Sequence, residues 1–306
     1  MTDALRDIPL LVAGGDEREL CLARRLLELG ARLSMAGFPR DVLPPGATGP
    51  VTLREAAGRV RAIVCPLSGT DAEGNIRVRM DAHVTLRLDG ASLAGCLPGT
   101  LLLIGTARPV VRELVRRLRL VLVELNQDEE MALLNSVPTA EGALQLAMAN
   151  LRITIHQSRA LVVGLGRCGQ QITRILVAMG ASVKAVVFNR VEGARAYILG
   201  VDAVHPDEIG AAAAEVDVVF NTAPAMMLSE PVLARMEPST LIIDIASDPG
   251  GTDFEAAKLK GLRAIHAVGL PGRVAPRTAG RILASVVPDL LARMLSASGG
   301  DPGAGG

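Results

Sequence analysis

Three glycines supply the most informative chemical signal in this sequence. Gly164, Gly166 and Gly169 have the spacing G-x-G-x-x-G, with an apolar run at residues 159–163 before them and a helical pattern at residues 170–179 after them. In this context the first glycine allows a tight turn, the second lets a pyrophosphate approach, and the third lets the helix pack closely on the strand. The helix N-terminus then attracts the phosphates. The context favours a dinucleotide site over a purely structural glycine turn.

The end of the next strand indicates which dinucleotide is bound. We expect this strand at residues 183–188, followed by Asn189 and Arg190, with Glu192 two residues further on. A carboxylate at the strand end holds the ribose of NAD and repels a 2′-phosphate, whereas an arginine accommodates that phosphate. We therefore expect NADP(H), with NAD(H) as the alternative. Arg190 could instead be a solvated residue at the start of a helix.

Three later strands should place further loops around the cofactor. We expect them at residues 217–221, 241–244 and 263–266, and each is followed by small and polar residues. Ligands of open α/β sheets lie beyond the carboxyl ends of the strands, so these loops should border the nicotinamide. The expected cofactor-binding residues are Gly164, Leu165, Gly166, Arg167, Cys168, Gly169, Asn189, Arg190, Asn221, Thr222, Ala223, Pro224, Ala246, Ser247, Gly269 and Leu270.

The first half of the chain repeats the strand, turn and helix pattern in a degenerate form. A strand at residues 9–13 enters a Gly14-Gly15 turn, a helix is expected at residues 17–29, and a strand follows at 32–36. Asp16, which follows the two glycines, would repel a phosphate. We expect a Rossmann-like or flavodoxin-like domain that does not hold the dinucleotide.

The loops of this first domain are candidates for contact with a substrate. Strands are expected at residues 62–65, 101–104 and 120–123. Ser68, Thr70 and Thr106 lie just beyond the first two of these strands and could supply neutral hydrogen bonds. The alternative is that these loops are ordinary turns between strands and helices.

Composition excludes several classes of protein. The chain has 306 residues, 49% hydrophobic content and a formal net charge of zero, with no Trp, one Tyr and four Phe. Neutral charge and few aromatic rings argue against nucleic-acid binding. We find no apolar stretch long enough for a membrane span, no signal-peptide layout and no metal-binding spacing of Cys or His. We expect a cytoplasmic protein without a metal, in which Cys168 is a small filler of the turn rather than a nucleophile.

The fold class we predict is α/β, with two Rossmann-like, doubly wound parallel-sheet domains, an interdomain cleft and a C-terminal helix that packs back on the first domain. The predicted parts are an N-terminal substrate domain (1–134), a dinucleotide-binding domain (135–280), the C-terminal helix (281–296) and a disordered tail (297–306).

Two prolines bear on how these parts connect. Pro138 disfavours helix before it, so we expect a helix that starts after Ser136 or Thr139 and runs to about residue 149. Glu141 would then lie near its N-terminus, as a catalytic group or as a residue that stabilises the helix dipole. Pro288 should interrupt the long helix at residues 278–295.

Several segments together resemble the A-subunit family of dipicolinate synthase. They are VAGGDER (12–18), CPLSGT (65–70), NSVPTAEG (135–142), GLGRCG (164–169), NTAP (221–224), DIASDPGGTD (244–253) and GLPGRVAPRTAG (269–280). The glycine turn is shared by many dehydrogenases, whereas the two long final loops are far more specific. The layout also resembles alanine dehydrogenase and, more distantly, 2-hydroxyacid and shikimate dehydrogenases.

The resemblance implies an NAD(P)-dependent oxidoreductase that forms dipicolinic acid during sporulation. Its substrate would be a dihydro- or hydroxytetrahydro-dipicolinate that branches from the lysine pathway. The family works with a partner, the flavoprotein-like B-subunit of dipicolinate synthase, and the resemblance places the enzyme in the mother cell. We also expect a homo-oligomer.

Such a reaction needs groups that hold two carboxylates and a group that moves a proton. Arg273 and Arg277 are the expected substrate clamps, because a guanidinium binds a carboxylate through two bonds, although both could lie on the outer face of their loop. Glu141, His266 and Asp248 are the candidate bases, and His266 could equally be a structural residue of a buried strand.

Two other functions stay open at this point. One is an amino-acid dehydrogenase of the alanine dehydrogenase type. The other is a nucleotide-binding regulatory protein without chemistry of its own, which the short supply of candidate bases would fit.

Overall fold

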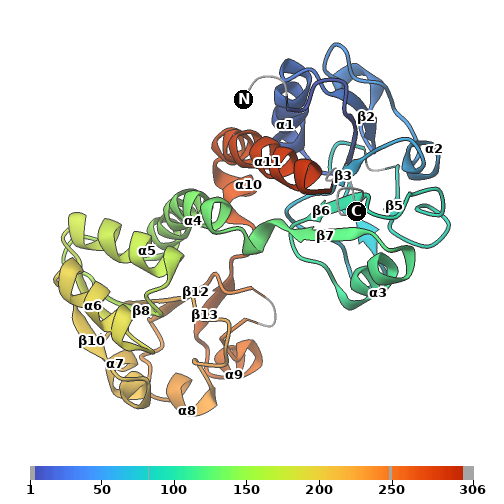
Figure 1. The fold of residues 1–306 in the computed structure, drawn as a ribbon. Helices are drawn as coiled ribbons and strands as arrows, with labels where there is room; N and C mark the ends of the chain where they lie inside the picture. The colour runs from blue at the N-terminus through green and yellow to red at the C-terminus, as the bar shows by residue number, and fades with distance from the viewer. Residues whose placement is uncertain (1–3, 82, 248–249, 299–306) are drawn as a thin grey trace, which may run out of the picture. The chain divides into compact units, whose positions relative to one another are not determined.

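The protein folds into two compact α/β units, described here from a computed structural model that covers residues 4–81, 83–247 and 250–298 (Figure 1). Unit 1 consists of Met1–Leu134 and Pro276–Gly306, and unit 2 consists of Asn135–Ala275. Each unit has its own parallel sheet. This is the predicted fold class of two Rossmann-like domains.

Unit 1 contains a five-stranded parallel sheet in the order β2-β1-β3-β6-β7. The strands are β1 (Pro9–Ala13), β2 (Arg32–Ala36), β3 (Ala62–Val64), β6 (Leu101–Ile104) and β7 (Val121–Glu124). The helices are α1 (Glu17–Glu28), α2 (Leu53–Ala57), α3 (Pro109–Leu118) and α11 (Pro276–Ser298), with 3₁₀ turns η1 (Arg40–Val42) and η2 (Leu125–Gln127). A small antiparallel hairpin is formed by β4 (Asn75–Ile76) and β5 (Leu86–Arg87). The order matches flavodoxin-like sheets.

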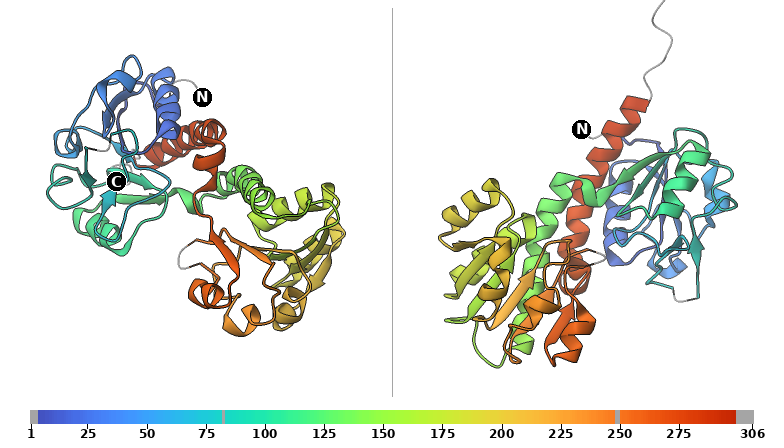
Figure 2. Two further views of the ribbon diagram at one scale, coloured as in Figure 1. Left: turned by 180° about the vertical axis from the view of Figure 1, so that it is seen from behind. Right: turned by 90° about the horizontal axis from the view of Figure 1, so that it is seen from below.

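Alternate side chains of these strands build two aliphatic layers. Leu10 and Val12 face the layer that α1 and α11 cover, and α1 lies beside α11 (Figures 1 and 2). Leu11 and Ala13 face the opposite layer, which α2 and α3 cover. Burial of both sheet faces explains the uninterrupted apolar runs in the strands. It also places the C-terminal helix in unit 1, as predicted.

Unit 2 contains a six-stranded parallel sheet in the order β10-β9-β8-β11-β12-β13. The strands are β8 (Arg159–Val163), β9 (Ser182–Val186), β10 (Asp202–Val204), β11 (Val218–Asn221), β12 (Leu241–Asp244) and β13 (Arg263–His266). The helices are α5 (Arg167–Ala178), α6 (Arg190–Leu199), α7 (Ile209–Ala213), α8 (Glu230–Leu233), α9 (Phe254–Leu259) and α10 (Leu270–Val274), with a 3₁₀ turn η3 (Pro206–Glu208). α4 (Glu129–Asn150) begins in unit 1 and continues into unit 2.

The sheet of unit 2 is covered on both faces. Val162 and Phe220 face a layer formed with α4 and α5, and Leu161 and Val219 face a layer formed with α7, α8 and α9. Strand β8 lies at the centre of the sheet, where the order of strands reverses. Such a switch point opens a crevice at the carboxyl ends of the strands.

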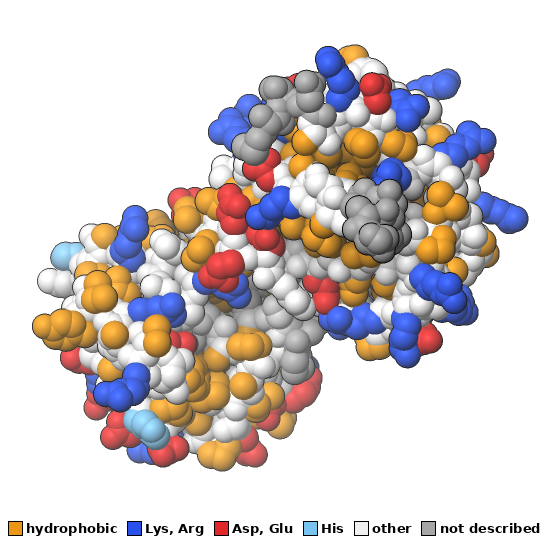
Figure 3. Space-filling view, viewed as in Figure 1, with side chains coloured by type: hydrophobic (Ala, Val, Ile, Leu, Met, Phe, Trp, Pro, Cys, Tyr) orange, Lys and Arg blue, Asp and Glu red, His pale blue; other side chains and the backbone are white. Residues whose placement is uncertain are grey.

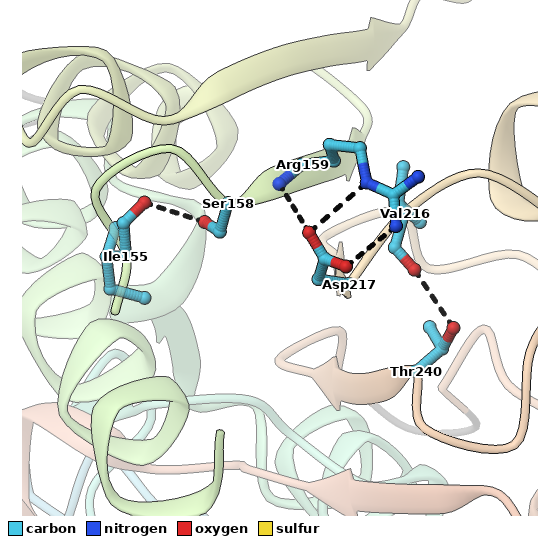
Figure 4. Close-up of polar contacts among 6 residues, drawn as sticks. All are labelled: Ile155, Ser158, Arg159, Val216, Asp217 and Thr240. Atoms are coloured by element: carbon cyan, nitrogen blue, oxygen red, sulfur yellow. Dashed lines mark hydrogen bonds and ion pairs between the residues drawn. The ribbon is translucent and has the colours of Figure 1, made fainter. Parts of the chain in front are cut away.

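Polar contacts fasten the opposite, amino edge of this sheet (Figure 4). Arg159, the first residue of β8, donates its backbone N–H to Asp217 at 2.7 Å, and its guanidinium bonds the same carboxylate at 2.8 and 3.3 Å. These bonds to Arg159 lower the pKa of Asp217. Thr240 donates its hydroxyl to the Val216 carbonyl at 3.0 Å. The strands are thereby held in register at one edge, which leaves the other edge for a ligand.

The structure corrects two expectations about proline. Pro138 lies inside the continuous helix α4, so no helix starts after Ser136 or Thr139 and Glu141 is not at a helix N-terminus. Pro288 likewise lies inside α11 without ending it. Each helix buries an apolar stripe, and that packing outweighs the lost backbone hydrogen bond. Ala140 and Ala143 contribute to the stripe of α4.

The C-terminal helix also extends further than its sequence pattern indicates. It begins at Pro276 and continues through residues 297 and 298, which the pattern assigns to the tail. The rest of that predicted tail, residues 299–306, lies outside the described residues. Within the described parts of the chain, no helix combines the length and apolar character needed to cross a membrane.

Candidate nucleotide-binding and active site

The glycine turn after β8 has the geometry that a dinucleotide loop requires. Gly164 has a φ of +88°, which is accessible to glycine at little cost. A Cβ at Gly169 would lie 2.0 Å from the Gly164 carbonyl oxygen, so α5 approaches the turn as closely as a glycine permits. Gly166 caps α5, and a Cβ there would meet nothing within 4 Å. The side of the turn at Gly166 is therefore open to a ligand.

Cys168 lies in the first turn of α5, and its thiol contacts Thr139 of α4. Burial raises the pKa of this thiol, which keeps it protonated and unreactive at neutral pH. This environment supports the prediction of a small filler. No cluster of three His, Cys, Asp or Glu side chains that could hold a metal occurs among the described residues.

The turn between β9 and α6 is organised by a side-chain cap. Asn189 accepts the backbone N–H of Glu192 at 2.9 Å, and Glu192 in return accepts the backbone N–H of Phe188 at 2.9 Å. Arg190 is the exposed first residue of α6 and makes no hydrogen bond or ion pair with any described residue. The polar atoms of Asn189 and Glu192 thus shape the turn, and the guanidinium of Arg190 is available to a ligand.

Arg195 is a residue of this region that sequence reasoning missed. It is half-buried on α6, and its Nη1 donates to the Leu165 carbonyl at 3.0 Å. Leu165 belongs to the glycine turn, so a cation on α6 is bonded directly to this turn. The only sequence signal for this role is an arginine on the helix that is expected after Arg190. This signal does not distinguish a solvated arginine side chain from one that is bonded to the protein.

The loop after β11 is tied to the glycine turn. The Thr222 hydroxyl lies 2.9 Å from the Val163 carbonyl oxygen and 3.1 Å from that of Gly164. Asn221 is fully buried, and its amide group bonds the backbone of Ala223 at 3.2 and 3.4 Å. The side chain of Asn221 therefore shapes this loop from beneath. Ala223 is buried beside it and Pro224 is exposed.

A buried carboxylate organises the loop after β12. Asp244 accepts the backbone N–H groups of Ala246 at 2.9 Å and Gly251 at 3.0 Å, and the hydroxyl of Thr252 at 2.6 Å. The sequence predicts ligand contacts at Ala246 and Ser247 but indicates no role for Asp244. Ala246 is buried and Ser247 is exposed, while the candidate base Asp248 lies outside the described residues.

His266 ends β13, which is an edge strand of the sheet. Its sequence context allows a structural residue of a buried strand, but its side chain is exposed. Its ring lies 5.3 Å from that of Phe254, and Nε2 lies 3.5 Å from the Ala246 carbonyl oxygen. The imidazole is therefore next to the loop after β12, where it can reach a ligand.

The residues after β13 have different environments. Gly269 has a φ of +68° and caps α10, and a Cβ at this position would meet nothing within 4 Å. Leu270 is buried, and its Cβ would lie 3.1 Å from a Cβ at Gly142 of α4. Leu270 therefore packs the core of unit 2.

Three charged candidates for substrate contact lie on different elements. Glu141 is exposed in the middle of α4, and Arg273 is exposed on α10. Arg277 is exposed in the first turn of α11, which belongs to unit 1. The sequence pattern places both arginines in one loop. The structure separates them, because a helix ends at Val274 and the next begins at Pro276.

The carboxyl edge of unit 1 brings the loops after β3 and β6 together. A Cβ at Gly105 would lie 1.8 Å from the Leu67 carbonyl oxygen, so the two loops touch through their backbones. Ser68 and Thr106 are exposed there, and Thr106 accepts the side-chain amide of Asn126 at 2.9 Å. Thr70 is buried, and its hydroxyl has no hydrogen-bond partner among the described residues.

The glycine turn of unit 1 is covered by its own chain. Gly15 donates its N–H to the Arg77 carbonyl at 3.2 Å and accepts the N–H of Arg79 at 3.0 Å. A Cβ at Gly14 would lie 2.5 Å from the side chain of Ile76, which belongs to β4. Because the hairpin region occupies the turn, its backbone groups are not available to phosphate. This arrangement supports the expectation that unit 1 does not hold the dinucleotide.

A buried charge cluster begins α1 beneath that turn. Asp16 caps the helix and pairs with the Arg18 guanidinium at 2.8 and 3.0 Å. Burial opposes ionisation of Asp16, but Arg18 outweighs it and lowers the pKa of this carboxyl. Glu19 is fully buried, accepts the Asp16 backbone N–H at 2.8 Å, and has its pKa raised to about 7 by burial.

Charge of both signs is present on the face shown in Figure 3. Basic and acidic side chains are interspersed over the face in Figure 3 and do not gather into one basic band. A formal net charge of zero agrees with this distribution.

The fold and the glycine turn define a nucleotide-binding dehydrogenase-like protein. Residues 137–250 match the family model for the NAD-binding domain of D-isomer-specific 2-hydroxyacid dehydrogenases. Residues 9–126 match the N-terminal domain of the dipicolinate synthase A-subunit. The chain is 37% identical over 301 residues to the dipicolinate synthase A-subunit of Bacillus subtilis (strain 168), covering 96% of this chain and 99% of that protein. This chain therefore belongs to the A-subunit family of dipicolinate synthase.

Solved structures agree with this membership. The crystal structure of the dipicolinate synthase A-subunit from Bacillus halodurans superposes with a TM-score of 0.90 at 34% identity, covering 94% of this chain and 98% of that one. An L-alanine dehydrogenase superposes with a TM-score of 0.65 at 16% identity, covering 96% of this chain and 91% of that one. The second likeness shows a common fold alone.

Proposed function

We propose that this chain catalyses the NADP⁺-dependent oxidation of dihydrodipicolinate, or of its hydroxytetrahydro precursor, to dipicolinate, with NAD⁺ as the alternative cofactor. The observation that carries the proposal is family membership across 96% of the chain. The open glycine turn and the accessible Arg190 of unit 2 support the cofactor assignment.

The reaction removes one hydride and one proton from the dihydropyridine ring. A bound nicotinamide would supply the two-electron acceptor for the hydride, and loss of the hydride and the proton would make the substrate ring aromatic. Aromatisation supplies driving force, so the protein mainly has to position the ring and remove the proton. The hydroxytetrahydro precursor must first lose water, a step that also needs a proton carrier.

Arginines are the side chains best suited to the two carboxylates of this substrate. Arg273 is exposed beside the strand-end loops of unit 2 and can form a two-bond pair with one carboxylate. We retain Arg277 of α11 as a separate proposed substrate contact. Ser68, Thr70 and Thr106 at the edge of unit 1 are proposed to donate neutral hydrogen bonds.

His266 is the base that the local geometry favours. Its ring is exposed at the carboxyl end of β13, next to Ala246, whereas Glu141 does not have the helix-terminal position that first suggested it. An imidazole positioned there can act as a general base toward the ring proton. We retain Glu141 as the second candidate because it is exposed next to Gly142, on which α10 packs.

We also propose that the chain acts as a homo-oligomer with the flavoprotein-like B-subunit of dipicolinate synthase, in the cytoplasm of the mother cell of a sporulating bacterium. The B. subtilis relative is named as one subunit of its enzyme, which supports a partner. Co-purification of the two proteins tests this assembly. Their failure to associate in any ratio would count against it.

The decisive experiment mixes the purified chain with the dihydropyridine precursor and either NADP⁺ or NAD⁺, and follows absorbance in the dipicolinate band and in the reduced-nicotinamide band. Formation of dipicolinate and reduced nicotinamide in equal amounts by the chain alone supports the proposal. Product only after addition of the B-subunit would indicate shared chemistry. Turnover of alanine or pyruvate instead, or cofactor binding without any turnover, would reject the proposed reaction.

A further inference from the structure

Helix α6 carries two arginines that face the nucleotide loops in different ways. Arg190 is exposed at the first residue of the helix, whereas Arg195 is half-buried and bonded. The Arg195 Nη1 atom donates to the Leu165 carbonyl at 3.0 Å, in the middle of the glycine turn. The two cations therefore differ in what they can recognise, although they lie on one short helix.

Leu165 is fixed from two sides. Its side chain is fully buried against Ala185 of β9 and Ala196 of α6. Its carbonyl is held by Arg195, the residue just before Ala196. The middle of the glycine turn is thus attached to α6 both by apolar packing and by a charge-assisted hydrogen bond, which is stronger than a bond between neutral groups.

The planarity of the peptide bond carries this constraint to the next residue. The Leu165 carbonyl and the Gly166 N–H belong to one trans peptide, so they point in opposite directions. A guanidinium that holds the carbonyl therefore fixes the direction of the N–H. Gly166 is the second glycine of the motif, the position at which the backbone approaches a pyrophosphate.

We propose that Arg195 is a positioning residue of the nucleotide site, which acts through the Leu165–Gly166 peptide and presents the Gly166 N–H to a bound diphosphate. The inference rests on the proposed function, since it takes unit 2 to bind a dinucleotide. It assigns Arg195 to the diphosphate that NAD⁺ and NADP⁺ share. Arg190 is assigned to the 2′-phosphate that only NADP⁺ has.

The test compares Arg195→Met, Arg195→Lys and a control variant, Arg174→Met, whose side chain is exposed on α5. Calorimetry measures Kd for NAD⁺, NADP⁺, ADP-ribose and AMP. Arg195→Met keeps an apolar stem but loses the donors, so Kd should rise about tenfold for the three ligands that contain a diphosphate and by the same factor for each. Arg195→Lys should recover part of the affinity, and Arg174→Met should change none of the four values.

Several results separate this role from a general structural one. AMP has only one of the two phosphates of the diphosphate, so its affinity should fall less in Arg195→Met than the affinity of the other three ligands. KM for the cofactor should rise while kcat at saturating cofactor stays the same. A rise in Kd for AMP equal to that for the dinucleotides, or a Kd for NAD⁺ equal to that of the unaltered chain, would overturn this inference and leave the proposed function standing. If the unaltered chain bound neither dinucleotide, the proposed function would fail and this inference would fail with it.

Discussion

The Asp244 carboxylate accepts the Thr252 hydroxyl at 2.6 Å and thereby joins the end of β12 to the residue that precedes the cap of α9. Both side chains are buried. The same carboxylate holds the backbone of Gly251. The sequence places the loop after β12 at the nicotinamide end of the site. The Asp244 side chain therefore joins the two ends of this loop.

Thr252→Val removes this hydroxyl and preserves the shape of the side chain. The buried carboxylate then loses a donor, and we expect unfolding free energy to fall by about 2 kcal/mol, with a rise in cofactor KM. Urea unfolding and initial-rate kinetics measure the two effects. Thr252→Ser keeps the hydroxyl and should retain most of both properties. A Val variant that is as stable as the unaltered chain and has the same cofactor KM would show that this hydrogen bond is not important.

Gly169→Ala tests the close approach of α5 to the glycine turn. The new Cβ would lie 2.0 Å from the Gly164 carbonyl oxygen, so the backbone must move. We expect a loss of roughly 3 kcal/mol in stability and weaker binding of either dinucleotide. Gly193→Ala is the matched control, because it lies within α6 and its Cβ would meet nothing within 4 Å. This control should gain up to about 1 kcal/mol.

Glu19→Gln tests the buried carboxyl beneath the turn of unit 1. Arg18 and Asp16 from the same helix and Cys65 after β3 surround this group. Burial raises its pKa in the folded state to about 7, from an ordinary value of 4.5. Between these two values the folded state binds more protons than the unfolded state, so stability falls as pH rises through this window. The full effect, present above pH 7, is roughly 3 kcal/mol.

The Gln variant stays neutral, so its stability relative to the unaltered chain should increase from pH 5 to pH 8. Thermal or urea unfolding across this range measures the change. Glu17→Gln, at an exposed position in the same first turn, is the control and should not reproduce it. A stability difference between Glu19→Gln and the unaltered chain that does not vary with pH would falsify the assignment.

Arg190→Ala tests cofactor choice. Removal of the guanidinium should raise KM for NADP⁺ about tenfold and leave KM for NAD⁺ nearly unchanged, because only NADP⁺ has the 2′-phosphate. Initial rates with each cofactor measure the ratio. Equal effects on both cofactors would reject contact with the 2′-phosphate. This pattern also contrasts with the equal weakening expected for Arg195→Met.

Most strands of the two parallel sheets were predictable from the sequence, because burial on both faces of a sheet leaves uninterrupted apolar runs. Strand β10 and the hairpin strands β4 and β5 were not predicted. The predicted strands at residues 9–13, 32–36, 101–104, 241–244 and 263–266 have the observed bounds. Helix ends near proline were predicted wrongly. The local preference that Pro138 imposes is weaker than the burial of Ala140 and Ala143 on the same helix.

The candidate site was predictable where backbone geometry dictates residue type. Gly164 and Gly169 fall in this class, since the first has a positive φ and the second lies against the Gly164 carbonyl. Asp244 and Arg195 were missed because their roles depend on which distant backbone groups they meet, namely Gly251 and Leu165. The exposure of His266 was not predictable, since a run of residues cannot indicate whether its strand is central or at an edge.

The hairpin that covers Gly14 and Gly15 has a consequence for how many nucleotides one chain can take. The chain contains two glycine turns of similar pattern, but in one of them both backbone groups of Gly15 are already bonded to residues 77 and 79. Titration should therefore reach saturation at one equivalent of dinucleotide per chain. A segment of the protein itself lies where a pyrophosphate would bind at the Gly14-Gly15 turn of unit 1. The hairpin therefore acts at this turn as a ligand that is part of the chain and cannot dissociate.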